Sequence, residues 1–363
     1  MRVAIAMSGG VDSLRTAVLL KAQGCEVFGL HMRFLPLYGH GPETVELVQS
    51  RLDALTALAV RFGVPLEVID VTREFETEVV NPFVSAYLGG LTPNPCVLCN
   101  PRMKFGALLD HALRLGADRF ATGHYARVEK AEGASGRMRL LRAKDLSRDQ
   151  SYFLMGLNQR QLGLALFPLG ETTKRETLDW AGNEGLGCLF PEDSQEICFI
   201  PSGNYKEFLR SRLGEIPRAD GPIVDMSGKR LGGHGGLHLY TVGQRRGLGI
   251  ASSEPYYVIG LDPSTNTVRV GRAIDLLCAE FEAATVNWVS IPPPESPIEC
   301  EVRIRNLHQP ARAQVIPVEG NKVLVRFEQP QRAVTPGQTA VFYAKEVVLG
   351  GGRIAKTGES VSR

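Results

Sequence analysis

The chain has 363 residues, which predicts two or three domains, and its 44% hydrophobic and 22% charged residues suffice for folded cores and exclude an intrinsically disordered protein. Its 41 Lys and Arg against 39 Asp and Glu give a net charge of +2, which excludes a histone-like polybasic protein but allows nucleic-acid binding through a local patch. Apolar runs are no longer than a strand, so we expect no membrane span. The apolar segment from Met1 to Met7 is too short for a secretory signal, so we expect a cytoplasmic protein whose seven cysteines are mostly reduced.

Up to about residue 200, strand-like apolar runs alternate with helical periodicity. Strands are predicted at 2–7, 26–31, 66–71 and 118–122, and helices at 12–22, 43–62 and around 105–115. Strands that alternate with helices form a parallel sheet with helices on both faces. We therefore expect residues 1–200 to form an α/β domain with a doubly wound parallel sheet.

The pattern changes after about residue 198. One more helix is predicted at 204–213, and short glycine-punctuated segments such as 232–236 and 243–249 are typical of turns and β-structure. Further on, apolar residues alternate with polar ones, which predicts strands at 300–305, 323–327 and 339–343. We expect a small central β-rich domain over 201–272 and a C-terminal β-barrel or sandwich over 273–363.

A glycine loop, Ser8-Gly9-Gly10-Val11-Asp12-Ser13, joins the first strand to the first helix. This order directs backbone N–H groups and the helix N-terminus at one point, where a phosphate is favoured, and Asp12 is an oxygen ligand for Mg²⁺. The alternative is an ordinary turn in which Asp12 or Ser13 caps the helix. The loop matches neither the Walker A nor the dinucleotide motif. It resembles the pyrophosphatase-type loop of adenine nucleotide alpha hydrolase-like enzymes, which cleave ATP between the α and β phosphates.

Two thiols stand three residues apart in the proline-rich segment 94–100, which we expect to be a loop. Arg102 and Lys104 follow, and such cations favour a thiolate. Cys198 is a third candidate. We interpret Cys25, Cys188, Cys278 and Cys300 as small core residues. A structural zinc half-site is the alternative for the pair, but no second pair of ligands is apparent.

With these cysteines the resemblance becomes specific, because the chain is similar to the tRNA-specific 2-thiouridylase family along its whole length. That family places sulfur on C2 of the wobble uridine of tRNA. The matching segments are 8–13, 94–100, 121–125 (ATGHY), 148–154 (RDQSYFL), 167–170 (FPLG), 196–200 (EICFI), 241–249 (TVGQRRGLG) and 335–338 (TPGQ).

The resemblance implies an ATP-dependent mechanism in which the uridine C2 oxygen is adenylated before sulfur replaces it. The residues that it assigns to ATP are Ala6, Met7, Ser8, Gly9, Gly10, Val11, Asp12, Ser13, Met32 and Gly123. Sulfur, relayed from donor proteins, is carried as a persulfide on Cys198. Cys99 is the nucleophile that releases it, either leaving a Cys99–Cys198 disulfide or freeing hydrosulfide that attacks C2.

Cys96 departs from the family pattern, since many members carry Asp there as an acid/base group. A thiol cannot take over that role unaltered. Together with Cys99 and Cys198 it forms a plausible triad for an iron–sulfur cluster with one open iron. The cluster and the persulfide–disulfide scheme both remain open at this point.

The same resemblance assigns tRNA contacts. They are Asn94, Pro95 and Cys96 against the target base, and His124, Arg148, Asp149, Gln150, Arg305, Asn306 and Gln338 elsewhere. The target base has to leave its stack to be adenylated. Without the resemblance, His124 is more simply a hydrogen-bonded structural residue and Arg305 a solvated charge. Binding through such patches should weaken steeply with salt.

Three other functions are compatible with parts of the sequence. A small-molecule adenylating synthetase shares the ATP loop but has no use for Cys99 or Cys198. A lysidine-forming tRNA synthetase also adenylates a base but transfers an amine without cysteines. A non-enzymatic RNA-binding or iron–sulfur protein would be expected to have lost Asp12 or a loop glycine, and this chain retains them.

Overall fold

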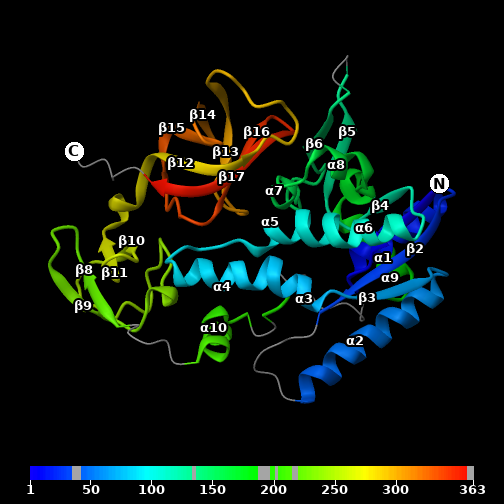
Figure 1. The fold of residues 1–363 in the computed structure, drawn as a ribbon, viewed down its shortest axis with the longest axis horizontal. Coiled ribbons are helices and arrows are strands. Elements are labelled where there is room, and N and C mark those ends of the chain that lie inside the picture. Colours follow the sequence, from blue (N-terminus) through cyan, green and yellow to red (C-terminus); the bar gives the residue numbers. More distant parts are fainter. Residues whose placement is uncertain (35–41, 133–135, 187–196, 201–202, 215–219, 358–363) are drawn as a thin grey trace. The chain divides into compact units, whose positions relative to one another are not determined.

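The computed structural model describes residues 1–34, 42–132, 136–186, 197–200, 203–214 and 220–357. They divide into two compact units (Figure 1). The first comprises Met1–Val79, Cys96–Asn204 and Glu346–Val348, and the second Val80–Pro95, Tyr205–Lys345 and the described part of Leu349–Arg363.

A five-stranded parallel sheet forms the centre of the first unit. Its order is β3 (Leu66–Asp70), β2 (Glu26–Arg33), β1 (Arg2–Ala6), β4 (Arg119–Ala121) and β7 (Ala165–Leu166). Val3, Ala4 and Ile5 of β1 are fully buried, as expected for a central parallel strand whose two faces are both covered. The predicted doubly wound α/β fold is confirmed, and the predicted strands end within about two residues of the observed ones.

Helices supply the cores around this sheet. Apolar residues of α1 (Val11–Ala22), α2 (Pro42–Arg61) and α9 (Lys174–Asn183), such as Leu14, Leu55 and Ala181, pack with Val3 and Ile5 in one cluster. Elsewhere Phe105 meets Phe120 of β4 edge-on, with ring centroids 5.5 Å apart. The remaining elements of this unit are α3 (Thr72–Phe75), a π-helical turn at Glu76–Val80 whose last residue belongs to the second unit, β5 (Ala126–Lys130), β6 (Met138–Arg142), α7 (Ser151–Leu154), α8 (Gln159–Leu164) and a 3-10 turn at Pro168–Glu171.

The segment around the cysteine pair is helical, so the prediction of a loop was wrong. α5 (Pro95–Cys99) continues through a π-helical stretch, Asn100–Leu108, into α6 (Leu109–Arg114), which also shows that the helix predicted around 105–115 begins earlier. Proline is tolerated in the first turn of a helix because its missing N–H would have no partner there. Pro95 stands at that position, and it therefore marks a helix start.

The second unit contains a four-stranded sheet of order β10–β11–β8–β9, formed by Tyr257–Asp262, Thr267–Gly271, Gly221–Val224 and Arg230–His234. Ile223, Val258 and Val268 are fully buried in its core. α4 (Asn81–Leu88) and α10 (Tyr205–Leu213) pack through aromatic rings, since Tyr87 stacks on Tyr205 with centroids 4.6 Å apart. The predicted central β-rich region and the helix at 204–213 are confirmed. Short 3-10 turns lie at Leu237–Leu239 and Ala273–Leu276.

Six strands close the C-terminal barrel. Their order is β12 (Leu277–Asn287), β15 (Lys322–Arg332), β14 (Ala311–Val318), β13 (Ile298–Arg303), β16 (Thr339–Ala344) and β17 (Val347–Thr357), and β17 returns to pair with β12. The barrel prediction is confirmed. The first two residues of β17, Val347 and Val348, pair with Leu141 and Leu140 of β6 inside the first unit.

The strand predicted at 300–305 is displaced, because β13 ends at Arg303 and Arg305 lies in a turn where it accepts a hydrogen bond from the N–H of His308 (3.0 Å). Cys300 is half-buried, Cys278 is buried, and Cys25 packs at the edge of the first core. Cys188 and Glu196, the first residue of the matched segment 196–200, lie outside the described residues. None of the described helices has both the length and the apolar character that crossing a membrane requires.

Candidate active site

The predicted ATP residues meet at the carboxyl edge of the parallel sheet. β1 runs directly into the Ser8–Ser13 loop, and β4 beside it runs into Thr122 and Gly123. Strand order changes direction around β1, which pairs with β2 on one side and β4 on the other. Open α/β sheets bind ligands at such switch points. The topology therefore gathers the loop and Gly123 at one place.

The loop is held by its own serines. The Ser8 N–H donates to Ser13 Oγ (3.3 Å), the Gly10 N–H to Ser8 Oγ (3.3 Å), and the Ser13 hydroxyl to the Gly10 carbonyl (2.8 Å). Gly9 has φ +86°, a conformation that favours glycine. Gly10 is the N-cap of this 12-residue helix and has no side chain to accept a hydrogen bond from the first-turn amides. That arrangement suits an anion such as phosphate.

Gly123 touches the loop backbone. A Cβ at this position would lie 2.9 Å from both the Asp12 carbonyl carbon and the Ser13 nitrogen. Only glycine allows this close approach, because it has no Cβ. The contact gives a physical reason for predicting Gly123, which is far from the loop in sequence, among the ATP residues. Among the others, Met7 and Val11 have buried side chains and offer backbone groups, Ala6 ends β1, and Met32 lies near the end of β2.

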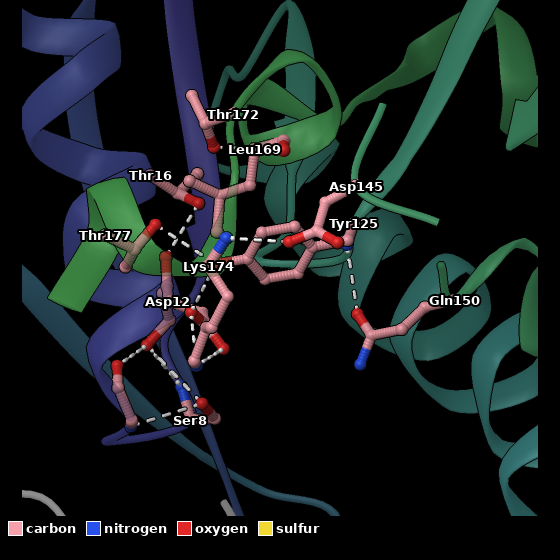
Figure 2. A network of polar contacts seen from close by, with 12 residues as sticks. Ser8, Asp12, Thr16, Tyr125, Asp145, Gln150, Leu169, Thr172, Lys174 and Thr177 are labelled. Carbon is pink, nitrogen blue, oxygen red and sulfur yellow. Dashed lines mark hydrogen bonds and ion pairs between the residues drawn. The ribbon is translucent and has the colours of Figure 1, made fainter. Parts of the chain in front are cut away.

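Asp12 is the centre of a polar network that sequence reasoning missed (Figure 2). The Lys174 ammonium lies 2.9 Å from each carboxylate oxygen of Asp12. The Tyr125 hydroxyl donates to Asp12 Oδ1 (3.0 Å) and lies 3.0 Å from Thr177 Oγ1. A signal did exist: Lys174 stands in the first turn of α9, where the helix macrodipole disfavours a cation.

Three cysteines gather in the first unit. Cys96 and Cys99 are three residues apart on α5 and thus on one face of the helix. Negative charge on Cys99 or on Cys96 raises the pKa of Cys198, so the three sulfurs are electrostatic neighbours although Cys99 and Cys198 are distant in sequence. All three are free thiols.

The protein around these sulfurs disfavours their charged form. Desolvation raises the pKa of Cys96, that of Cys99 to about 11 and that of Cys198 to about 12. Cys96 and Cys198 are nevertheless exposed, whereas Cys99 is buried, so two of the three remain accessible to a reagent. Lys104 lowers all three pKa values, whereas Arg102 is paired with Glu78 at 2.9 Å. Of the two cations that the sequence singled out, Lys104 acts on the thiols.

A cluster of metal ligands is not formed in this conformation. The part of the chain that the structure describes contains no group of three or more His, Cys, Asp or Glu side chains placed to hold a metal ion. The three thiols therefore do not fit an iron–sulfur cluster as they are arranged here. Asp12 is different, because one carboxylate beside a phosphate loop is a usual protein ligand for Mg²⁺ that ATP brings with it.

His124 is buried beside the thiol cation. Its Nε2 lies 3.4 Å from Lys104 Nζ and its Nδ1 2.7 Å from Thr122 Oγ1. Burial, together with the Lys104 charge, holds the pKa of His124 well below its usual range. Because an ammonium only donates, Nε2 accepts and Nδ1–H donates to the threonine. His124 is thus a neutral, hydrogen-bonded residue in this structure, and its contact with tRNA stays a prediction.

The other predicted tRNA residues differ in exposure. Asp149 is buried and accepts hydrogen bonds from the N–H groups of Ala143 and Ser151, and Gln150 accepts one from the N–H of Tyr125, so both organise their own loop. Arg305 is exposed in the turn after β13. The Gln338 amide donates to the Thr92 carbonyl (2.9 Å). Asn94, Arg148 and Asn306 are partly exposed, and Pro95 is buried.

Together these features define an α/β nucleotide-binding protein of the type that presents a phosphate loop and a separate group of thiols. Family models match the chain in three parts. They are the tRNA methyl transferase HUP domain over 1–202, the tRNA methyl transferase PRC-barrel domain over 206–272 and the aminomethyltransferase beta-barrel domain over 278–354.

The chain belongs to the tRNA-specific 2-thiouridylase family. It is 46% identical over 366 residues to tRNA-specific 2-thiouridylase MnmA of Solibacter usitatus, covering 97% of this chain and 98% of that protein. Identity to the protein of the same name from Chloroflexus aurantiacus is 45% over 357 residues, covering 98% of both. The resemblance inferred from the motifs is confirmed.

Solved structures are more distant. U34-tRNA thiolase NcsA from Methanococcus maripaludis with its [4Fe-4S] cluster matches with a TM-score of 0.35 and 17% identity, covering 59% of this chain and 67% of that one. A 4-thiouridine synthetase–RNA complex with bound ATP matches with a TM-score of 0.31 and 16% identity, covering 60% and 51%. At these values neither likeness bears on the chemistry of this chain.

Proposed function

We propose that this chain replaces the C2 oxygen of the wobble uridine of tRNA with sulfur, after ATP has adenylated that oxygen. Membership of the tRNA-specific 2-thiouridylase family makes the chain a tRNA-uridine 2-sulfurtransferase. The finer proposal concerns the route. The observation that carries it is the presence, in one compact unit, of a phosphate loop at a sheet edge and of three mutually interacting thiols.

Adenylation solves the leaving-group problem of the first step. The C2 oxygen of uridine attacks the α phosphate of ATP, the bond between the α and β phosphates breaks, and pyrophosphate leaves. The amides at the start of α1 and the loop serines are suited to hold that pyrophosphate. Asp12 would hold the Mg²⁺ that accompanies ATP through the oxygen lone pairs that Lys174 and Tyr125 leave, and the ion would supply positive charge to the phosphates.

Sulfur transfer then uses the thiols. The terminal sulfur of a Cys198 persulfide, which donor proteins supply, attacks C2, and AMP leaves with the former C2 oxygen. The Cys99 thiolate attacks the Cys198 sulfur, the S–S bond to the base breaks, and the base keeps one sulfur as a thiocarbonyl. A Cys99–Cys198 disulfide remains and has to be reduced. The electrostatic proximity of Cys99 and Cys198 supports a route in which these two thiols react with each other.

The test separates adenylation from sulfur transfer. Purified protein is incubated with tRNA, α-labelled ATP, Mg²⁺ and a persulfide donor, and tRNA nucleosides are analysed by mass spectrometry. We expect 2-thiouridine together with AMP and pyrophosphate. Cys198→Ser should give no thiouridine yet still release pyrophosphate when tRNA is added, whereas Cys278→Ser, in the barrel, should behave as the unaltered protein.

The rival assignment, a small-molecule adenylating synthetase, gives a different result. Such an enzyme would release pyrophosphate at a rate that tRNA does not change. It would also be indifferent to Cys198→Ser. Either result would overturn the proposed route.

A further inference from the structure

A buried lysine lies directly beneath the phosphate loop. The side chain of Lys174 is 7% exposed, while that of Asp12, its partner, is 29% exposed. Both carboxylate oxygens of Asp12 lie 2.9 Å from the Lys174 ammonium, so the ion pair is symmetric (Figure 2). A buried ammonium is costly unless it is paired. The buried position of Lys174 therefore depends on its ion pair with Asp12.

The position of Lys174 on its helix supports the same conclusion. Thr173 caps α9 through a reciprocal pair with Glu176, and Lys174 is the next residue. A cation in the first turn opposes the helix macrodipole, which favours anions there. The unfavourable placement is compensated by the long-range partner, since Asp12 and Lys174 are 162 residues apart in sequence.

Neighbouring groups fix the orientation of Asp12 from other directions. The Tyr125 hydroxyl reaches Asp12 Oδ1, and the Thr16 hydroxyl donates to the Asp12 carbonyl (2.9 Å). The Tyr125 backbone is in turn held by Gln150, whose side chain accepts its N–H and whose own N–H donates to its carbonyl (2.8 Å). The carboxylate is therefore held in one orientation beside the loop.

The positive charge of Lys174 affects how the loop can bind phosphate. An aspartate inside a loop that receives polyphosphate places a negative charge next to negative oxygens, and such repulsion is strong at short range in a partly desolvated site. Lys174 cancels that charge and holds it in place. We propose that Lys174 is a positioning residue of the ATP site, which acts through Asp12 to let the loop accept pyrophosphate and the β and γ phosphates of ATP. This inference rests on the proposed function.

The experiment measures binding of inorganic pyrophosphate in the presence of a chelator, so that no metal masks the Asp12 charge. Isothermal titration is carried out on the full chain and on Lys174→Met, which is similar in length but neutral. We expect affinity to fall by about tenfold or more, because Asp12 is left uncompensated. Lys144→Met removes an exposed lysine of the same unit and should change affinity by less than about twofold.

A double variant decides how Lys174 acts. In Asp12→Asn/Lys174→Met neither charge is present, and pyrophosphate affinity should return to within about threefold of the unaltered protein. If Lys174 instead contacted the phosphates itself, the double variant would stay well below the affinity of the unaltered protein, because it also lacks that contact. This comparison also stands alone if Lys174→Met does not fold, because the double variant leaves no uncompensated charge.

Two further outcomes separate this inference from the function on which it rests. If the unaltered chain binds ATP and pyrophosphate and Lys174→Met binds pyrophosphate equally well, the role of Lys174 is refuted and the proposed function stands. If the unaltered chain binds neither ligand, the ATP-dependent function fails first. An equal loss of AMP and pyrophosphate affinity in Lys174→Met would show general damage to the site and would also overturn the inference.

Discussion

Cys99 and Cys198 are thiols that the surrounding protein keeps protonated at neutral pH. Desolvation raises their pKa values to about 11 and about 12, and Lys104 opposes that effect at both positions. Thiolate is the reactive form of cysteine. A thiol with a raised pKa has a smaller thiolate fraction at any pH below that pKa, so its reactivity increases as the pH rises. Sulfur chemistry in this protein is therefore sensitive to the charge that Lys104 provides.

Replacing Lys104 with Met should slow the alkylation of the two exposed thiols, Cys96 and Cys198, whose pKa values Lys104 lowers. Loss of the positive charge raises their pKa values further, and we expect iodoacetamide to react at least about threefold more slowly at pH 9. Peptide mass spectrometry over pH 7 to 11 measures each site separately. Lys130→Met, an exposed change on β5, is the matched control. Equal alkylation rates in Lys104→Met and the control would show that Lys104 does not tune the thiols.

Among the helices and strands, the sequence predicts those whose structure depends on residues close together in the chain. β1 was predictable because a central parallel strand is an unbroken apolar run, and Val3, Ala4 and Ile5 are all fully buried. The proline-rich segment around the cysteine pair predicts a loop, yet proline also starts helices, and α5 begins at Pro95. Local composition did not distinguish the two structures.

In the candidate site as well, the sequence predicts some residues and misses those that depend on long-range contacts. The sequence identifies the loop from its motif and Gly123 through the family resemblance, but it does not identify Lys174, because the partner of Lys174 is 162 residues away and only tertiary packing brings the two together. The network of Tyr125 and Thr177 depends on the same packing. Residues defined by long-range pairs carry no periodic signal in a single sequence.

Gly123 contacts the loop so closely that adding a side chain at this position should weaken ATP binding. A methyl group at position 123 would lie 2.9 Å from the Asp12 carbonyl carbon and the Ser13 nitrogen, so Gly123→Ala has to displace the loop. We expect ATP affinity to fall by about tenfold or more in calorimetric titration. Gly182→Ala is the control, since its Cβ meets nothing within 4 Å. Unchanged ATP binding in Gly123→Ala would mean that the loop does not need this close approach.

At the scale of the whole molecule, the charge balance is the main constraint on RNA binding. A net charge of +2 gives no overall attraction to tRNA, so affinity has to come from local groups. The two compact units hold different parts of the predicted interface. Arg148 and His124 belong to the first, while Arg305, Asn306 and Gln338 belong to the second. A substrate that engages both would be held by several dispersed phosphate contacts, each of which releases counterions.

Salt dependence of tRNA binding tests this view residue by residue. The logarithm of affinity should fall linearly with the logarithm of salt concentration, and Arg305→Gln should reduce the slope by about 1, because an exposed arginine that meets a phosphate releases about one counterion. Filter binding between about 50 and 200 mM salt measures both slopes. Arg175→Gln removes an arginine whose side chain is 90% exposed and which pairs with Asp179 at 3.8 Å, and it should leave the slope unchanged. Equal slopes for Arg305→Gln and Arg175→Gln would show that Arg305 is not part of the interface. If the tRNA affinity of the unaltered chain did not change with salt concentration, dispersed phosphate contacts would not be what holds the tRNA.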